Sequence, residues 1–495
     1  MRVCLINPPR IQPKLWGKPS VFQPLDIAYV AAMLEKQHEV HIIDAPNEGW
    51  RILEEIDGTK YRQGLTNIEI ADRIKKWSPV VVGITIPFSG WCKPAYELAS
   101  LTKSVDQNIT TVLNGLHPSA RSADCLTNPN VDFVVIGEPE QTMFELTDAL
   151  EKGNPSDFEK VKGIGFRKDG KTILTSPRPA IQNLDSLPFP ARHLLPMDAY
   201  FAAVKESPLR GEISKPWTVM ITSRGCPNNC VFCSVHVVNG KQWRSRSPEN
   251  VVDEIEQLVQ TYHIKQIDFN DDNMTLNKER MKSICDLIVR RGIDIEWYNP
   301  TGVRADSLDE DLLRKMKKSG CKKLRVAPES GVQSVVNQII KKNLNLKDVE
   351  KAVVLCKKVG IKVGCFFVIG FIGETKEEIE ETINYAYKLK QLGADSFIFS
   401  IATPLYGTEL YEQAKNGGFL RECFNDEALS EAEPLIETSD FTADDLRRLC
   451  SKANLVNPTF TRRSFARAIR DPKKAVKIIF GRRKMTWKQK QSSVS

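Results

Sequence analysis

The stretch Ile221-Thr222-Ser223-Arg224-Gly225-Cys226-Pro227-Asn228-Asn229-Cys230-Val231-Phe232-Cys233 decides how the whole chain is interpreted. It places three cysteines within eight residues, directly after an apolar run from Trp217 to Thr222 that is typical of a buried strand. Three thiolates at this spacing are soft ligands that can hold three irons of a 4Fe-4S cluster. The fourth iron would then have no protein ligand, and an open coordination position is what a catalytic cluster needs.

Zinc is the alternative metal for this loop. His236 lies three residues after Cys233 and could complete a Cys₃His site. Structural zinc usually takes its ligands as two separated pairs rather than from one packed run, which favours the iron-sulfur interpretation. Gly225 and Pro227 also suit a loop whose backbone folds closely around a bulky inorganic core.

Residues 217–420 contain six strand-helix units, of which the cysteine loop follows the first strand. The expected strands are Trp217 to Thr222, Ile264 to Phe269, Ile293 to Tyr298, Lys322 to Val326, Lys362 to Ile369 and Ala394 to Ser400. Helix start signals are expected at Ser307 with Glu310, at Thr375 with Glu378 and at Ser247-Pro248. Six parallel units with right-handed crossovers predict a partial (β/α)6, TIM-like barrel whose working face lies at the carboxyl ends of the strands.

Residues 1–152 alternate short β-branched runs with helical patterns. The expected strands are Val3 to Asn7, Glu39 to Asp44, Val80 to Ile86, Thr110 to Asn114 and Asp132 to Ile136. The expected helices are Leu25 to Lys36, Asn67 to Trp77, Pro94 to Val105, Ser119 to Thr127 and Glu140 to Lys152. This alternation predicts an α/β domain with a doubly wound, Rossmann-like parallel sheet, and a ligand beyond the carboxyl ends of its strands.

Two further regions complete the predicted organisation. Residues 153–216 are interpreted as a linker with a small hairpin, because Asp169-Gly170 is a two-residue turn signal between two short strands. Residues 421–495 are predicted to be a small, polar, helical C-terminal region. At 495 residues the chain is long enough for about three domains.

Composition and charge narrow the class of protein. With 41% apolar and 27% charged residues the chain is typical of a globular protein. No apolar run approaches the roughly 20 residues that span a bilayer, and the N-terminus lacks signal-peptide features, so a cytoplasmic location is expected. The excess positive charge lies between Thr461 and Lys490, where twelve Lys and Arg face the single acid Asp471.

This basic tail allows two interpretations. A solvated tail is the simpler one. However, Asp471-Pro472 is a helix start, and Ala475, Val476, Ile479 and Phe480 follow at one-face spacing among cations. Such a helix could lie on a membrane surface or bind a polyanion.

The cysteine loop resembles that of the radical S-adenosylmethionine (SAM) superfamily, in the spacing Cys226-x₃-Cys230-x₂-Cys233 and in the aromatic Phe232. The resemblance extends over about residues 1–420 and is similar to the branch with an N-terminal cobalamin-binding domain. Further motifs fall in order at successive strand ends: Arg244-Ser245-Arg246-Ser247-Pro248, Phe269-Asn270-Asp271-Asp272-Asn273, Gly302-Val303-Arg304-Ala305-Asp306, Glu329-Ser330-Gly331 and Gly370-Phe371-Ile372-Gly373-Glu374-Thr375.

The resemblance implies roles for individual residues. SAM would chelate the open iron, and one electron would cleave it to methionine and a 5′-deoxyadenosyl radical. The cluster ligands would be Cys226, Cys230 and Cys233, and the SAM contacts would be Phe232, Asp271, Asp272, Arg304, Glu329, Ser330 and Gly370. Phe232 could also be a plain loop hydrophobe, and the two aspartates could be helix caps.

Cobalamin would lie between the two domains. The expected contacts are Gly115, His117, Ser119, Gly137 and Glu138, at two strand ends of the first domain. An Asp-x-His-x-x-Gly motif is absent, so a histidine from that motif does not supply a lower cobalt ligand. His117 could instead be a loop histidine that bonds backbone.

The resemblance implies a cobalamin-dependent C-methyltransferase that acts on an unactivated carbon. The alternatives are a radical cyclase or rearrangement enzyme without methyl transfer, an RNA methylthiotransferase with a second cluster from Cys4, Cys92 and Cys125, and an iron-sulfur sensor. The expected partners are a small-molecule or lipid substrate and a low-potential electron donor such as flavodoxin or ferredoxin. Peripheral membrane contact would come from the tail, and nucleic acid is not expected. No motif identifies the substrate or a catalytic side chain beyond the cofactor contacts.

Overall fold

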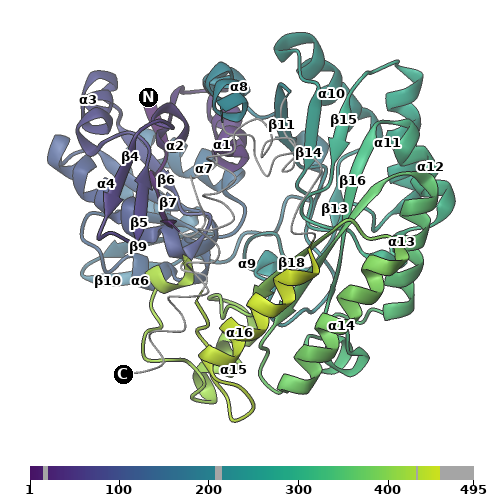
Figure 1. Ribbon diagram of the computed structural model, residues 1–495. Coiled ribbons are helices and arrows are strands. Elements are labelled where there is room, and N and C mark those ends of the chain that lie inside the picture. Colours follow the sequence, from purple (N-terminus) through teal and green to yellow (C-terminus); the bar gives the residue numbers. More distant parts are fainter. Residues whose placement is uncertain (15–20, 207–214, 431–432, 458–495) are drawn as a thin grey trace, which may run out of the picture.

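The computed structural model describes residues 1–14, 21–206, 215–430 and 433–457. Two α/β units lie side by side, the first drawn in purple and blue and the second in teal and green (Figure 1). The C-terminal segment, drawn in yellow-green, lies near both of them (Figure 1). In the described residues no helix is long and apolar enough to cross a membrane. The predicted basic tail helix falls outside the described residues.

The first unit is built on a seven-stranded sheet of order β10-β9-β8-β7-β6-β1-β3. Its strands are β1 (Arg2–Asn7), β3 (Glu39–Asp44), β6 (Val81–Thr85), β7 (Thr110–Asn114), β8 (Phe133–Val135), β9 (Ile164–Lys168) and β10 (Lys171–Leu174). The five strands from β8 to β3 are mutually parallel. The hairpin predicted within the linker forms as β9-β10, and it extends this sheet through antiparallel pairing with β8.

Alternating side chains of the interior strand β1 pack against helices on both faces of this sheet. Val3 and Leu5 pack in one apolar cluster with α1 (Leu25–Leu34) and α7 (Pro139–Lys152). Cys4 and Ile6 pack in the other cluster with α3 (Asn67–Trp77) and α4 (Cys92–Val105). Strands buried on both faces read as continuous apolar runs. The helices of this unit are α1 (Leu25–Leu34), α2 (Ala45–Glu48), α3 (Asn67–Trp77), α4 (Cys92–Val105), α5 (Leu116–Ala120), α6 (Ser122–Cys125) and α7 (Pro139–Lys152).

The second unit is a six-stranded parallel sheet of order β11-β14-β15-β16-β17-β18, as predicted for a partial barrel. Its strands are β11 (Trp217–Met220), β14 (Gln266–Phe269), β15 (Glu296–Tyr298), β16 (Cys321–Glu329), β17 (Lys362–Ile369) and β18 (Ser396–Ile401). The helices α10 (Pro248–Tyr262), α11 (Lys278–Arg290), α12 (Glu310–Lys318), α13 (Leu346–Val359) and α14 (Lys376–Leu392) cover its outer face, each in contact with the next (Figure 1).

Local signals fix the ends of most of these helices. The predicted cap at Ser247 and the capping box of Thr375 with Glu378 are both present. The predicted box of Ser307 with Glu310 is wrong. Asp309 caps α12 instead, because its carboxylate accepts the backbone N–H of Leu312 at 2.9 Å.

Several elements were not expected from the sequence. A small antiparallel sheet joins β2 (Arg10–Pro13), β5 (Lys60–Gln63) and β4 (Leu53–Ile56) in that order. The single helix expected at Ser119 to Thr127 is instead the two short helices α5 and α6. The strands β12 (Ser223–Arg224) and β13 (Arg244–Ser245) pair beside the cysteine loop, and α9 (Val235–Val238) follows that loop.

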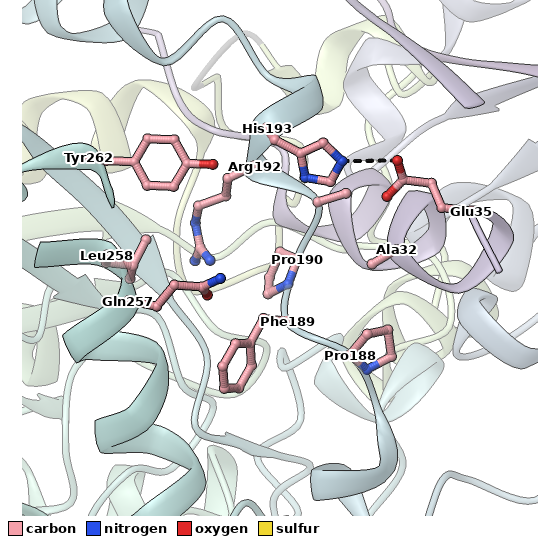
Figure 2. A pocket seen from close by; sticks show the side chains of 11 residues that line it. Ala32, Glu35, Pro188, Phe189, Pro190, Arg192, His193, Gln257, Leu258 and Tyr262 are labelled. Carbon is pink, nitrogen blue, oxygen red and sulfur yellow. Dashed lines mark hydrogen bonds and ion pairs between the residues drawn. The ribbon is translucent and has the colours of Figure 1, made fainter. Parts of the chain in front are cut away.

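The linker, which includes α8 (Met197–Glu206), is anchored to the barrel by a buried ion pair. Arg192 donates to the Glu254 carboxylate of α10 at 2.6 Å, and both side chains are at most 3% exposed. A cavity of about 330 Å³ lies beside this anchor, between α1, the linker and α10 (Figure 2). His193 closes one side of it by its 2.9 Å contact with Glu35 (Figure 2). None of the predicted cofactor residues lines this cavity, so it belongs to the joint between the units.

The C-terminal segment, the described residues after β18 (402–430 and 433–457), packs back onto both units. It contains α15 (Glu409–Asn416), the short turn η9 (Glu427–Ser430) and α16 (Ala443–Ala453). The turn η9 contacts η2 (Ser89–Trp91) of the first unit, and α16 contacts β18 and α14 of the barrel.

Candidate functional site

The cysteine loop begins at the carboxyl end of β11, at the face where barrel enzymes place their sites. Gly225 opens it with φ 81°, and a Cβ at this position would lie 2.3 Å from the carbonyl oxygen of Gln242. Only glycine fits this close approach of two backbone segments. The cysteines that follow are partly buried.

Two neighbouring carboxylates hold this loop from the end of β14. Asp271 is 1% exposed and accepts the N–H of Thr222 at 3.1 Å, the Thr222 hydroxyl at 2.7 Å and the Ser223 hydroxyl at 2.6 Å. Asp272 accepts the N–H of Gly225 and the side-chain amide of Asn239, both at 2.8 Å. The aspartates predicted as SAM contacts therefore position the loop through their carboxylates.

The three thiols suit a multi-iron cluster better than a single zinc ion. In the described part of the chain, Cys226, Cys230, Cys233 and His236 do not form a group of ligand atoms within 4.8 Å of one another, which one ion would require. His236 is occupied by the backbone carbonyl of Cys226, 2.9 Å from its Nε2. A cubane distributes its sulfur ligands over separate irons, so wider spacing fits it.

Burial favours the protonated form of two of the cysteine thiols. It raises the pKa of Cys230, and it raises the pKa of Cys233 to about 12. Because iron binds thiolates, loading the loop must displace these protons. The amide of Asn228 lies 3.2 Å from the Cys226 sulfur, and the amide of Asn273 lies 3.7 Å from the same sulfur.

A buried ion pair lies beside the loop and was not anticipated. Glu329, at the end of β16, is 5% exposed and accepts the Lys342 ammonium at 2.7 Å. Glu329 has φ 66°, a left-handed conformation that is uncommon for a residue with a side chain. The positive charge of Lys342 is close enough to favour the thiolate form of Cys230. Lys342 lies in a polar run without a recognisable motif, so only the fold reveals it.

Arg304 acts on the same segment. It donates to the carbonyl of Lys342 at 3.0 Å and to the carbonyl of Asn343 at 2.9 Å, and it pairs with Asp306. The side chain therefore clamps the backbone that presents Lys342.

The remaining predicted SAM residues lie around the ends of β16 and β17. Ser330 is fully buried and shares a 2.8 Å hydrogen bond with Thr382 of α14. Phe232 packs against Phe371 with ring centroids 5.6 Å apart, and this contact brings the cysteine loop against the loop after β17. A side chain at Gly370 would meet Leu446 of α16.

Unsatisfied acceptors next to the cysteine loop fit the ammonium group of SAM. The side-chain oxygens of Asn270 and Asn273 are buried and have no hydrogen-bond partner. Such groups are costly unless a ligand or water completes them. The sequence interpretation selected the two acids between these asparagines, because charge was the visible signal.

The predicted cobalamin residues lie at the carboxyl ends of β7 and β8. Gly115 has φ 111°, and a Cβ there would lie 2.7 Å from the Ile86 carbonyl oxygen. The Ser119 hydroxyl accepts the N–H of Gly137 at 3.0 Å, which links the two strand ends. His117 is 1% exposed, and its Nε2 lies 3.0 Å from the Tyr96 hydroxyl.

Orphaned polar groups at this edge fit a large, amide-rich ligand such as cobalamin. Asn114 at the end of β7 and Asn47 after β3 have both side-chain polar atoms buried without a partner, and the Ser89 hydroxyl after β6 is also unpartnered. Three strand ends of a parallel sheet thus offer buried hydrogen-bonding groups where such sheets bind ligands.

The two sets of strand ends are joined by buried charges. Glu138 is 2.9 Å from Arg244 and 3.2 Å from Arg224, and Glu140 is 2.5 Å from Arg224. Arg224 immediately precedes the cysteine loop, and the Val238 carbonyl of α9 lies near Gly137. The face predicted for cobalamin therefore lies directly against the cysteine loop.

The cysteines proposed for a second cluster do not form one ligand set in the described residues. Cys4 lies within β1 and is fully buried. Cys92 and Cys125 begin α4 and end α6, and only Cys92 belongs to a group of side chains that could hold a metal ion.

Comparison with known families identifies both units. The B12 binding domain family model matches residues 19–147, and the radical SAM superfamily model matches residues 220–386.

Two relatives match most of the chain. An uncharacterised methyltransferase of Pyrococcus horikoshii is 35% identical over 457 residues, covering 92% of this chain and 91% of the relative. The cytidylyl-2-hydroxyethylphosphonate methyltransferase of Streptomyces wedmorensis is 32% identical over 438 residues, covering 81% and 79%. The anaerobic magnesium-protoporphyrin IX monomethyl ester cyclase of Rubrivivax gelatinosus is 28% identical, covering 70% of this chain and 61% of the cyclase.

The fold is also that of a solved enzyme. The radical SAM methyltransferase TsrM of Kitasatospora setae matches with a TM-score of 0.66 and 18% identity, covering 85% of this chain and 77% of that one.

Proposed function

The chain belongs to the cobalamin-dependent radical SAM family, and we propose that it transfers a methyl group to an unactivated carbon of a small-molecule substrate. It is a radical SAM enzyme with a 4Fe-4S cluster, SAM and cobalamin as cofactors. The observation that carries the proposal is the buried contact of Glu138 and Glu140 with Arg224. This contact sets the strand ends of the B12-binding domain against the cluster loop.

The cluster would be held by Cys226, Cys230 and Cys233. When bound, the cluster supplies the electron that cleaves SAM, and cobalamin supplies the carrier of the methyl group. The chain itself contributes binding, orientation and charge.

Individual side chains would perform these tasks. Asp271 and Asp272 hold the cluster loop through five protein donors, so they fix the loop before any ligand binds. Lys342 would attract the carboxylate of SAM, and the oxygens of Asn270 and Asn273 would accept its ammonium. The buried wall of charge pairs around Glu138 would keep water from the space between the units.

Product analysis under anaerobic conditions tests the proposal. The reconstituted protein with SAM and a reductant should yield 5′-deoxyadenosine together with S-adenosylhomocysteine. The variant Cys230→Ala should yield neither product, and Cys423→Ala, at an exposed cysteine, should yield both. Normal SAM cleavage by Cys230→Ala would contradict the ligand assignment.

A cyclase without methyl transfer is the second candidate, and the similarity to the cyclase of Rubrivivax gelatinosus favours it. The two functions differ in the products of SAM. Deoxyadenosine without S-adenosylhomocysteine would support the cyclase, and a substrate product heavier by one methyl group would support the methyltransferase.

We propose a small-molecule or lipid substrate, and the reductive cleavage of SAM requires an electron donor. We propose a low-potential flavodoxin or ferredoxin as donor, a cytoplasmic location, and peripheral membrane contact through residues 461–495. The high positive charge of that tail supports attraction to anionic lipid. Deletion of residues 461–495 should abolish sedimentation with anionic liposomes, and retained binding would refute the membrane contact.

A further inference from the structure

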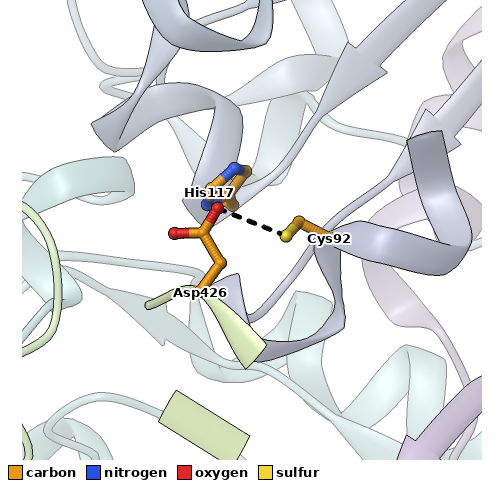
Figure 3. A group of neighbouring side chains, drawn as sticks. All are labelled: Cys92, His117 and Asp426. Atoms are coloured by element: carbon orange, nitrogen blue, oxygen red, sulfur yellow. Dashed lines mark hydrogen bonds between the residues drawn. The ribbon is translucent and has the colours of Figure 1, made fainter. Parts of the chain in front are cut away.

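A sulfur, a nitrogen and an oxygen ligand meet at the junction of the first unit with the C-terminal segment. Cys92 is the first residue of α4, His117 lies in α5, and Asp426 directly precedes η9. One ligand atom of each lies within 4.8 Å of those of the other two. Figure 3 shows the three side chains converging from separate segments.

One ring nitrogen of His117 is available as a metal ligand in this group. His117 is 1% exposed, and its Nδ1 is buried without any hydrogen-bond partner. Its Nε2 lies 3.0 Å from the Tyr96 hydroxyl, which can accept a hydrogen bond from an Nε2–H group. In the tautomer that carries its proton on Nε2, Nδ1 is free to bind a metal ion.

The Asp426 carboxylate is likewise held by a tyrosine hydroxyl. The Tyr406 hydroxyl donates to Asp426 Oδ1 at 2.6 Å, while Oδ2 lies 3.6 Å from the Cys92 sulfur (Figure 3). No Lys or Arg forms an ion pair with Asp426 in the part of the chain that the structure describes. Nearby cations pair with other acids: Arg121, which stacks on the Tyr406 ring, pairs with Asp124, and Lys93 pairs with Glu427. The negative charge of Asp426 therefore lacks a counterion.

We propose that Cys92, His117 and Asp426 bind one Zn²⁺ ion that clasps the C-terminal segment to the first unit. Thiolate, imidazole and carboxylate are the ligand types that zinc prefers, and three protein ligands leave one position for water. The ion supplies the missing positive charge for Asp426 and the missing partner for His117 Nδ1. Two ligands come from the first unit and one comes from a residue more than 300 positions later in the chain.

The site is separate from the cluster loop. It contains none of Cys226, Cys230 and Cys233, and its histidine is not His236. His117 is predicted above as a cobalamin contact, and the present inference assigns its side chain to the metal ion instead. Its expected role is to fasten the segment that contains η9, which packs on η2 beside the strand ends of the B12-binding domain. The inference does not depend on whether the enzyme is a methyltransferase or a cyclase.

Metal analysis of the full chain tests the proposal. Protein purified anaerobically from zinc-supplemented medium and dialysed against a weak chelator should retain about one zinc per chain in addition to its iron. The near-isosteric variant Asp426→Asn should lose at least nine-tenths of this zinc and keep its iron. Asp124→Asn, at an exposed acid on the adjoining helix α6, is the matched control and should keep both metals.

Further measurements make each outcome decisive. Zinc X-ray absorption should show one sulfur ligand with nitrogen and oxygen ligands, and Cys92→Ser should remove the sulfur. Retained iron in each variant reports that the chain has folded. Wild-type protein without zinc, or zinc that survives Asp426→Asn, would overturn the proposal. Zinc that is lost from Cys230→Ala rather than from Asp426→Asn would place the ion at the cluster loop and would overturn it as well.

Discussion

Lys342 is the residue on which the charge balance beside the cluster loop depends. Its ammonium is buried, pairs with Glu329 at 2.7 Å and lies near Cys230. Removing one partner of a buried ion pair typically costs about 3–5 kcal/mol. We expect Lys342→Met to lower the free energy of unfolding by roughly this amount and to weaken SAM binding at least tenfold, about 1.4 kcal/mol. Urea unfolding and SAM titration measure the two effects.

The neighbouring residue provides a matched control for this variant. Lys341 carries the same charge, but its side chain is exposed and pairs with Glu409. Lys341→Met should change SAM affinity by less than about twofold. Equal effects of the two substitutions would show that the buried pair has no special role.

Glu374 makes the stability of the barrel depend on pH. Burial raises its pKa to about 8, and its Oε1 has no partner, while Oε2 accepts the N–H groups of Gly370 and Phe371. Between its ordinary pKa of 4.5 and about 8, the folded state holds a proton that the unfolded state has released. The stabilising contribution is therefore fully present below pH 4.5 and falls as the pH rises toward 8.

The variant Glu374→Gln distinguishes the effect of Glu374 on stability from the effects of other titrating groups. Its urea midpoint should fall less than that of the wild type between pH 5 and pH 8, because the amide does not titrate. Parallel pH profiles for the two proteins would show that Glu374 is ionised in the folded state.

The cluster loop is held in place by residues that follow the neighbouring strand β14. Asp271, at the end of β14, accepts donors from Thr222 and Ser223, and hydrogen bonds to a charged group contribute about 1.5–3 kcal/mol each. We expect Asp271→Asn to lose several kcal/mol of stability and more than half of its reconstituted iron. Asp294→Asn, at an almost fully exposed aspartate, should behave like the wild type. Full iron content in Asp271→Asn would refute this positioning role.

Elements with strong local signals could be predicted, and those that depend on distant pairing could not. The strand Lys362–Ile369 is a continuous apolar run and was placed with its observed bounds. In contrast, β2 and β5 are short and lie about 50 residues apart, so their pairing has no local pattern. The predicted cap of α12 is wrong because Ser307 and Asp309 both precede the helix, and only the structure shows that Asp309 accepts the Leu312 N–H.

The same distinction between local signals and distant contacts applies to the residues of the candidate site. The cluster cysteines are visible because all three ligands lie within one loop. Lys342 and Asp426 have no motif, and their partners lie elsewhere in the chain, so only the folded structure brings them into contact with the site. Asp271 was identified by its position after a strand, but its hydrogen bonds to the loop required the structure.

At the scale of the whole molecule, buried ion pairs hold the two units against each other. Glu138 of the B12-binding domain contacts both Arg224 and Arg244 of the barrel, and all three side chains are at most 9% exposed. Glu138→Gln removes the negative charge that these arginines share, and a broken buried pair costs about 3–5 kcal/mol. We expect its thermal unfolding to separate into two transitions.

The same variant should uncouple the two products of SAM. Formation of S-adenosylhomocysteine should fall more than formation of 5′-deoxyadenosine, because only the former requires both units to act together. Glu151→Gln, at a half-exposed residue of α7, the helix that directly follows Glu138, is the control. An equal loss of both products would assign the joint to stability alone.

The most direct test of the account is electron paramagnetic resonance of the reduced protein with and without SAM. A 4Fe-4S cluster held by Cys226, Cys230 and Cys233 with one open iron should give a signal whose g values shift when SAM is added. A signal that SAM leaves unchanged, or a loop that holds zinc in place of the cluster, would contradict the account.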